Sequence, residues 1–190
     1  ASTGIRPGSL LDPVLKLKHV EDIPNGCKAV KVYDNSKEGY WAFLTQEASK
    51  ALDNYLNWRK RNGEELTPDS VLFKNYKNPN TKNEHLSDNS TRQILDNLMR
   101  LAGIERIKTI NRFDKAIIYG FRKRFNTILK LENDVNSNIA EKLMGHKKGL
   151  DGSYLKPTRE QCFNEFEKAI PSLTISDEER LKLKNRELEE

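Results

Sequence analysis

A single β-hairpin is the sequence feature that most limits how this chain can fold. Residues 27–33 alternate and are rich in β-branched side chains, and residues 40–44 are β-prone again. The stretch between them, residues 34–39, has the composition of a turn. Residues 14–19 are a further candidate for a short strand. All other patterned stretches favour helix, so the sequence predicts a mainly α fold with one small antiparallel β-sheet.

Start and stop residues bound the expected helices. Thr45 is a plausible N-cap for a helix with an apolar stripe, and Gly63 ends that helix. Polar residues 63–85 read as loop, and capping boxes open each of the last two helices. The chain is expected to form one domain over residues 1–175, followed by a charged tail helix over 176–190. The predicted helices cover residues 46–61, 87–101, 119–131, 136–146, 159–169 and 177–189.

Charge is unevenly distributed along the chain. The net charge is +5, but residues 105–130 carry eight basic side chains against two acidic ones, a local charge of +6. The last fifteen residues carry six acids and four bases, a local charge of −2. The basic stretch suits a phosphate backbone, although a solvated helix face explains such a run about equally well.

Cysteine and histidine usage points away from a metal or disulfide scaffold. Cys27 and Cys162 are isolated and show no metal-ligand spacing, which predicts a reducing compartment. The three histidines are scattered, and no zinc motif connects them. No signal peptide and no apolar run of membrane-spanning length is visible.

A set of short segments is informative in combination. They are Thr-Gly-Ile-Arg at residues 3–6, a lysine in the hairpin turn at Lys37, Tyr-Gly-Phe-Arg at 119–122, Leu-Met-Gly-His at 143–146, and Tyr-Leu-Lys-Pro at 154–157. In order and spacing they resemble the tyrosine recombinase family. That family has an arginine in a Thr-Gly-x-Arg segment, a lysine on a β-hairpin turn and a His-x-x-Arg box. A Leu-x-Gly-His segment then precedes the nucleophilic tyrosine by eight or nine residues.

The resemblance implies a role for each of these side chains. Two guanidinium groups, Arg6 and Arg122, suit the non-bridging oxygens of a phosphodiester. Lys37 is the candidate general acid for the leaving 5′-oxygen, and His146 can donate to a non-bridging oxygen or manage the proton of the nucleophile. Tyr154 is the candidate nucleophile. Expected DNA contacts come from Lys115, Lys123, Arg124, Lys147 and Lys148.

Two positions depart from the family pattern. Tyr119 stands where the family usually has the histidine of His-x-x-Arg, and a neutral phenol is a poor base near pH 7. Ser9 stands where the family usually has glutamate, so an orienting carboxylate is missing or comes from elsewhere. Both departures suggest reduced but real activity.

The resemblance also implies partners and context. The family cleaves double-stranded DNA through a 3′-phosphotyrosyl intermediate without metal, nucleotide or other cofactor, and assembles as tetramers on DNA. This chain begins almost at the first motif, so the family's N-terminal DNA-binding domain is expected to be missing. We expect a cytoplasmic protein of prokaryotic or viral origin. The alternatives are a type IB topoisomerase-like enzyme, a DNA-binding module with a decayed active site, and a helical interaction protein without DNA.

Overall fold

The computed structural model describes residues 2–76, 84–132, 134–146 and 154–189. It contains a three-stranded antiparallel sheet in the order β1-β2-β3. The predicted hairpin is confirmed, because β2 (Lys28–Val32) pairs with β3 (Tyr40–Leu44) along its whole length. The strand predicted over residues 14–19 is wrong, since residues Leu17–His19 form a 3₁₀ turn and β1 covers Val20–Asp22 instead.

The sheet is covered on both faces, which explains why β2 is almost continuously buried. Ala29 and its cross-strand partner Phe43 face one hydrophobic cluster, which contains Phe125. Val30 and its partner Ala42 face a second cluster, which contains Leu52. Alternate residues of a strand point to opposite faces, so a strand between two apolar layers loses its polar positions.

Helices make up most of the rest of the chain. The predicted helix over 46–61 is found with the same limits, and the Thr45 hydroxyl accepts from the backbone N–H of Ala48. The helix predicted over 119–131 is α-helical only to Thr127 and continues as a wider π turn, Ile128–Glu132. The helices are α1 (Gln46–Arg61), α2 (Asp88–Leu101), α3 (Ile118–Thr127), α4 (Ser137–Leu143), α6 (Arg159–Glu167), α7 (Ile170–Leu173) and α8 (Asp177–Glu189).

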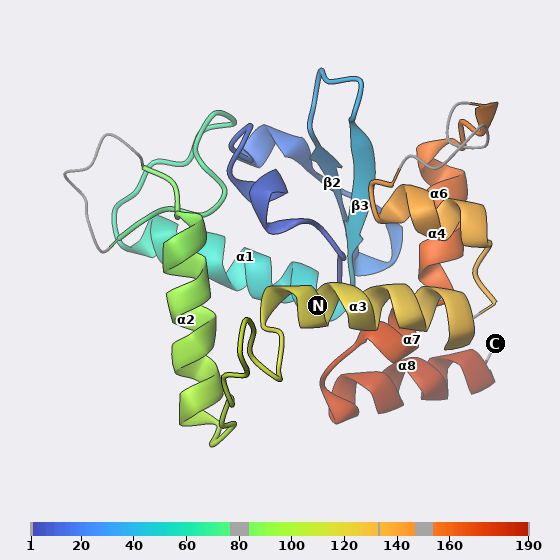
Figure 1. Cartoon of the computed structure of the whole chain (residues 1–190). Coiled ribbons are helices and arrows are strands. Elements are labelled where there is room, and N and C mark those ends of the chain that lie inside the picture. The colour runs from blue at the N-terminus through green and yellow to red at the C-terminus, as the bar shows by residue number, and fades with distance from the viewer. Residues whose placement is uncertain (1, 77–83, 133, 147–153, 190) are drawn as a thin grey trace.

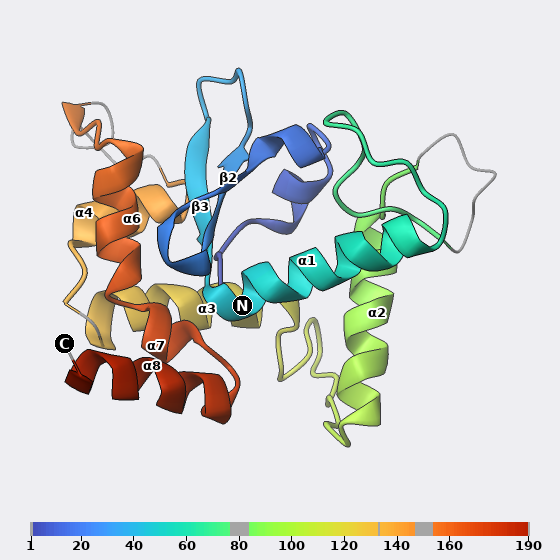
Figure 2. The ribbon, with the colours of Figure 1, turned by 180° about the vertical axis from the view of Figure 1, so that it is seen from behind.

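The helices surround the sheet unevenly (Figure 1). α3 crosses in front of one end of the sheet, and the view from behind shows α1 crossing on the other side (Figure 2). α4, α6, α7 and α8 gather on one flank, whereas α2 stands out on the opposite flank and has no buried residue. In the described ranges no helix is both long enough and apolar enough to cross a bilayer.

The tail helix packs onto the rest of the domain. The Glu47 carboxylate accepts hydrogen bonds from the backbone N–H groups of Ile175 (2.8 Å) and Ser176 (3.0 Å), immediately before α8. Leu183 of α8 packs against the cluster that holds Phe125. The expected tail helix is therefore present, and it is docked on its own chain.

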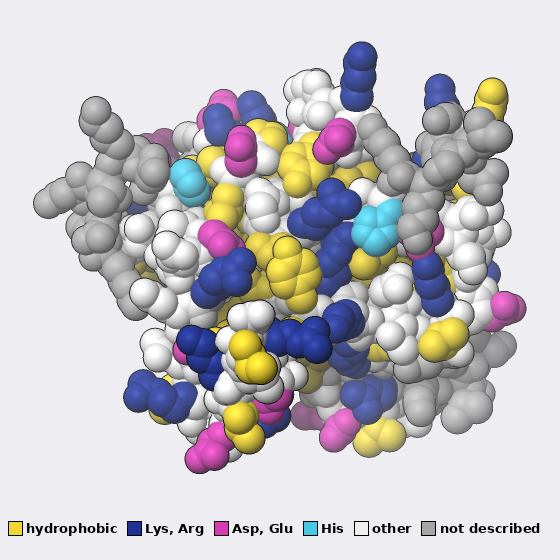
Figure 3. Space-filling model, viewed as in Figure 1, with side chains coloured by type: hydrophobic (Ala, Val, Ile, Leu, Met, Phe, Trp, Pro, Cys, Tyr) yellow, Lys and Arg dark blue, Asp and Glu magenta, His cyan; other side chains and the backbone are white. Residues whose placement is uncertain are grey.

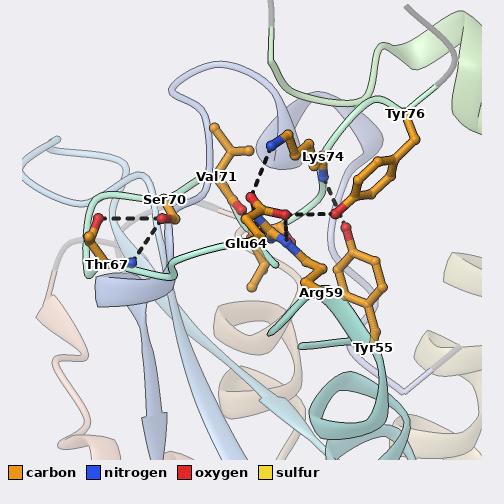
Figure 4. A network of polar contacts seen from close by, with 9 residues as sticks. Tyr55, Arg59, Glu64, Thr67, Ser70, Val71, Lys74 and Tyr76 are labelled. Atoms are coloured by element: carbon orange, nitrogen blue, oxygen red, sulfur yellow. Dashed lines mark hydrogen bonds and ion pairs between the residues drawn. The ribbon is translucent and has the colours of Figure 1, made fainter. Parts of the chain in front are cut away.

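A buried ion pair anchors the C-terminal end of α1 (Figure 4). The Arg59 side chain is 0% exposed, and its guanidinium meets the Glu64 carboxylate at 2.6 Å. Its remaining N–H groups donate to the carbonyls of Val71 and Leu72, and the same carboxylate accepts from Tyr76. This network ties the polar loop after α1 to the helix, because a buried guanidinium needs all of its donors satisfied.

Candidate active site

Arg122 lies at the centre of the candidate site. The residue is only 8% exposed, and its guanidinium donates to two backbone carbonyls, those of Gly4 and Met144 (2.7 Å for Met144). The Nη2 atom also lies 2.8 Å from Nε2 of His146. One side chain from α3 thus joins the N-terminal segment to the turn after α4.

Close packing brings the Gly4 carbonyl to this guanidinium. Gly4 has φ +55°, and a Cβ at this position would stand 2.3 Å from the ring of Phe125. Phe125 is one turn beyond Arg122 on α3 and is buried in the core. Only glycine fits here without strain, because it tolerates both the left-handed backbone and the ring contact.

The end of α4 places His146. Gly145 has φ +65° and its N–H donates to the carbonyl of Lys142, while the N–H of His146 donates to the carbonyl of Glu141. These two bonds form a Schellman motif, which reverses the chain and satisfies the last helical carbonyls. The reversal leaves the His146 ring between Arg122 and Glu141, with Nδ1 2.7 Å from a Glu141 carboxylate oxygen.

Arg6 approaches the same turn from the N-terminal segment. Its Nη2 donates to the carbonyl of Gly145 at 3.4 Å. Burial lowers the pKa of Arg122 from its ordinary value, and the charge of nearby Arg6 acts in the same direction. The structure thus brings Arg6, Arg122 and His146 together, and the two guanidinium groups make the site locally positive.

The other three predicted catalytic side chains are far more exposed than that of Arg122, and within the described residues Tyr119 and Tyr154 form no hydrogen bond with this cluster. Tyr119 is the second residue of α3, one turn before Arg122, and is 57% exposed. Lys37 is exposed in the turn between β2 and β3. Tyr154 is 80% exposed.

The predicted DNA-contacting residues fall into different environments. Lys123 is exposed on α3, whereas the ammonium of Lys115 donates to the carbonyl of Glu105. Arg124 is half-buried, and its Nη2 donates to the carbonyl of Ser172 at 2.7 Å. Lys147 and Lys148 lie outside the described residues, as does the glycine-bearing segment before Tyr154.

Basic side chains nevertheless dominate one face of the molecule. Figure 3 shows Lys and Arg side chains spread across the middle of the face on which α3 lies in Figure 1, with acidic side chains scattered around them. The long-range field of such a face favours an anionic partner.

Sequence reasoning missed two residues beside the site, Tyr40 and Glu141, and singled out a third, Ser9, only as a departure from the family pattern. The Tyr40 ring lies against Gly145, and burial raises the pKa of its phenol. Ser9, which stands where the family usually has glutamate, is fully buried, and its hydroxyl donates to the Tyr33 oxygen at 2.9 Å. Glu141 contacts His146 directly; its position one turn before the Gly-His pair is the only sequence signal that points to it.

Three solved structures with a similar arrangement of elements are recombinases. A XerH site-specific recombinase bound to its difH substrate in a pre-cleavage complex superposes with a TM-score of 0.56 at 20% identity over 77% of this chain. A XerA recombinase gives 0.56 at 19% identity over 87%, and a XerH post-cleavage complex gives 0.55 at 18% over 99%.

The chain has the fold of a tyrosine recombinase catalytic domain. It spans 37%, 53% and 43% of the length of these three recombinases, in the order given. No protein-family model matches the sequence, and no curated protein matches it. The fold predicted from the motifs is therefore confirmed by structural similarity. The sequence identity of 18–20% supports a shared fold and nothing beyond it.

Proposed function

We propose that this chain is the catalytic part of a site-specific DNA recombinase that breaks and rejoins strands through a 3′-phosphotyrosyl link to Tyr154. The observation that carries the proposal is the convergence of Arg6, Arg122 and His146, which are up to 140 positions apart in the sequence, on one turn of backbone. Neither a surface helix nor a structural core requires two guanidinium groups and an imidazole at one place.

The chemistry of phosphodiester cleavage explains why these groups are needed together. Phosphoryl transfer depends mainly on positioning and on neutralising charge at the phosphate oxygens. A guanidinium fork matches two oxygens at once, so Arg6 and Arg122 would hold the non-bridging oxygens. The Tyr154 oxygen would attack phosphorus as its proton passes to Nε2 of His146, and the 5′-oxygen would depart with a proton from Lys37. Attack by a 5′-hydroxyl on the tyrosyl phosphate would reverse the step.

Partners and context follow from the same proposal. The XerH structures contain DNA substrate, and we infer that double-stranded DNA is the partner of this chain as well. Lys115 and Lys123, and the undescribed Lys147 and Lys148, are the proposed backbone contacts. We propose that the chain works as a tetramer on paired sites, in the cytoplasm and without a cofactor.

Covalent capture tests the proposal without knowledge of the target sequence. The chain is incubated with a pool of nicked duplexes whose arms are randomised, so that the short strand released by cleavage diffuses away. Denaturing gels then isolate protein–DNA adducts, the DNA is sequenced, and mass spectrometry locates the modified residue. We expect an adduct on Tyr154 that is lost in Tyr154→Phe and kept in Tyr76→Phe, another exposed tyrosine. Adducts on another residue, or none, would refute the proposal.

One observation favours a second candidate, a DNA-binding module with a decayed active site. The exposed Tyr154 phenol has no hydrogen bond to Arg6, Arg122 or His146 in the described part of the chain. Such a module would retain duplexes in a salt-dependent way, because binding releases counterions, and would give no adduct. A type IB topoisomerase-like enzyme would form the adduct and relax supercoils without paired sites.

A further inference from the structure

The Glu141 carboxylate lies behind His146 and joins it to a lysine. One oxygen of Glu141 is 2.7 Å from Nδ1 of His146, and the other is in an ion pair with the ammonium of Lys130. The carboxylate side chain is 16% exposed, so solvent screens these contacts only partly. Glu141 belongs to α4 and Lys130 to the π turn after α3, which ties the two elements of the site to each other.

The contacts on both sides of the ring decide which nitrogen carries the proton. A guanidinium has only donors, so Nε2 of His146 must accept from Nη2 of Arg122, 2.8 Å away. A carboxylate has only acceptors at neutral pH, so Nδ1 must donate to Glu141. Both contacts require the same tautomer, a neutral ring with its proton on Nδ1.

We propose that Glu141 is a positioning residue, which holds His146 in the Nδ1–H tautomer and so keeps Nε2 as a proton acceptor beside Arg122, at the proposed phosphate site. The role of that site in DNA cleavage rests on the proposed function above. Glu141 itself touches no reacting atom and acts through the imidazole. Carboxylates that hold one nitrogen of a histidine fix both its tautomer and its ring orientation.

Glu141 supplies an orienting carboxylate, which Ser9 cannot. The Ser9 hydroxyl donates to the Tyr33 oxygen, and a serine has no carboxylate with which to orient another side chain. Glu141 contributes a carboxylate to the same cluster from α4, on the other side of the imidazole from the guanidinium. The Schellman turn fixes the distance between the Glu141 carboxylate and the His146 ring, because the backbone N–H of His146 donates to the carbonyl of Glu141 itself.

Nuclear magnetic resonance of the imidazole tests the proposal without DNA. Long-range ¹H–¹⁵N spectra of the full chain should show His146 with protonated Nδ1 and bare Nε2, and a downfield Nδ1 proton protected from exchange. The chain has three histidines, so His146→Asn assigns the signals. We expect the downfield proton to move upfield in Glu141→Gln, whose amide oxygen still accepts, and to vanish in Glu141→Ala.

A matched control separates positioning from helix stability. The Glu165 carboxylate also supports α4, by accepting from the backbone N–H of Asn136 at the start of the helix, but it does not touch His146. Glu165→Gln should therefore leave the His146 signals unchanged. An Nε2–H tautomer in the wild type, or a downfield proton that persists in Glu141→Ala, would overturn the proposal.

Adduct formation provides the second readout. The rate with nicked duplex should fall about 10–100-fold in Glu141→Ala, the range typical of partners that orient a histidine, and Glu141→Gln should recover most of it. Equal rates in wild type and Glu141→Ala would contradict a positioning role. If the wild type forms no adduct, the recombinase proposal fails, while the tautomer spectra still decide the role of Glu141.

Discussion

Gly145 and Tyr40 are in direct contact, with no room for a side chain between them. A Cβ on Gly145 would stand 2.5 Å from Cε1 of Tyr40, and the glycine has φ +65°. The carbonyl of Gly145 accepts from Arg6. The contact with Tyr40 therefore fixes the position of the backbone turn that binds Arg6 in the candidate site.

Gly145→Ala should therefore destabilise the fold and displace the site. We expect a loss of about 2–4 kcal/mol in the free energy of unfolding, from left-handed backbone strain and overpacking together. Urea denaturation measures it. Gly103→Ala is the control, since Gly103 has φ +69° with nothing within 4 Å of the added methyl, and should lose only about 1 kcal/mol. Equal losses would show that the Tyr40 contact is unimportant.

Arg122→Lys should abolish most cleavage. A lysine keeps the charge but cannot donate at once to the carbonyls of Gly4 and Met144 and to a phosphate. We expect single-turnover adduct formation to fall by about 10²–10³, as for the loss of one preorganised donor. Lys60→Ala, which changes an exposed lysine of α1 outside the proposed site, should leave the rate nearly unchanged. A variant that cleaves at the parent rate would remove Arg122 from the mechanism.

Tyr119→His tests the departure from the family pattern. A histidine can accept a proton near pH 7, which the Tyr119 phenol cannot, so single-turnover cleavage should speed up, by about 10²-fold if full general-base catalysis is restored. The side chain is 57% exposed, so folding stability should be nearly unaffected. Equal rates for the two proteins would show that Tyr119 carries no catalytic penalty.

The pair between Arg59 and Glu64 makes stability depend on acidic pH. Hydrogen bonding to Arg59 lowers the pKa of Glu64 from 4.5 to about 2. Because the folded-state pKa is depressed, this stabilisation is complete above about pH 4.5 and is lost as the pH falls toward 2. Glu64→Gln should cost about 3 kcal/mol in the free energy of unfolding at pH 7, since it leaves a buried guanidinium without its counter-ion, and should flatten the pH dependence between 4.5 and 2.

Asp69→Asn is the control for that experiment. Asp69 pairs with Lys16 and Lys18 in full contact with solvent, where ion pairs contribute little. Denaturation at pH 3 and pH 7 should give nearly the same curves for this variant and the parent. A pH dependence that Glu64→Gln leaves unchanged would contradict the assignment to Glu64.

Both cysteines should resist modification in the folded protein. Burial raises the pKa of Cys27 and of Cys162 from 9.0 to about 11. At pH 8 only about one thiol in a thousand is then ionised, and the thiolate is the reactive form. Labelling with a disulfide reagent should proceed only as fast as the protein unfolds, and should become rapid in urea. Rapid labelling of the native chain would show that a thiol is accessible.

Local signals explain which parts of the fold were predictable. The limits of α1 follow from Thr45 and the chain reversal before Gly63, both of which act within a few residues of the helix ends. The strand predicted over 14–19 failed because its pairing is remote: Lys16 forms an isolated bridge with Val71, while β1 pairs with β2. Whether a short segment becomes a strand depends on partners that sequence alone does not place.

The candidate site likewise contains residues that local motifs predict and residues that only packing brings into it. Arg6, Arg122 and His146 were predictable because each belongs to a motif with fixed spacing, and the structure places them together. Tyr40 and Glu141 were not, since their importance arises from packing against Gly145 and His146. No motif distinguishes Tyr40 from a tyrosine that only fills a core.

Main-chain carbonyls, not carboxylates, anchor Arg6 and Arg122. Over the residues that the structure describes, neither guanidinium forms a salt bridge with an acidic side chain. Under the proposed function, a phosphodiester that enters the site would therefore displace no carboxylate from either guanidinium. Phosphate binding would then involve no exchange of a protein counter-ion at these two side chains.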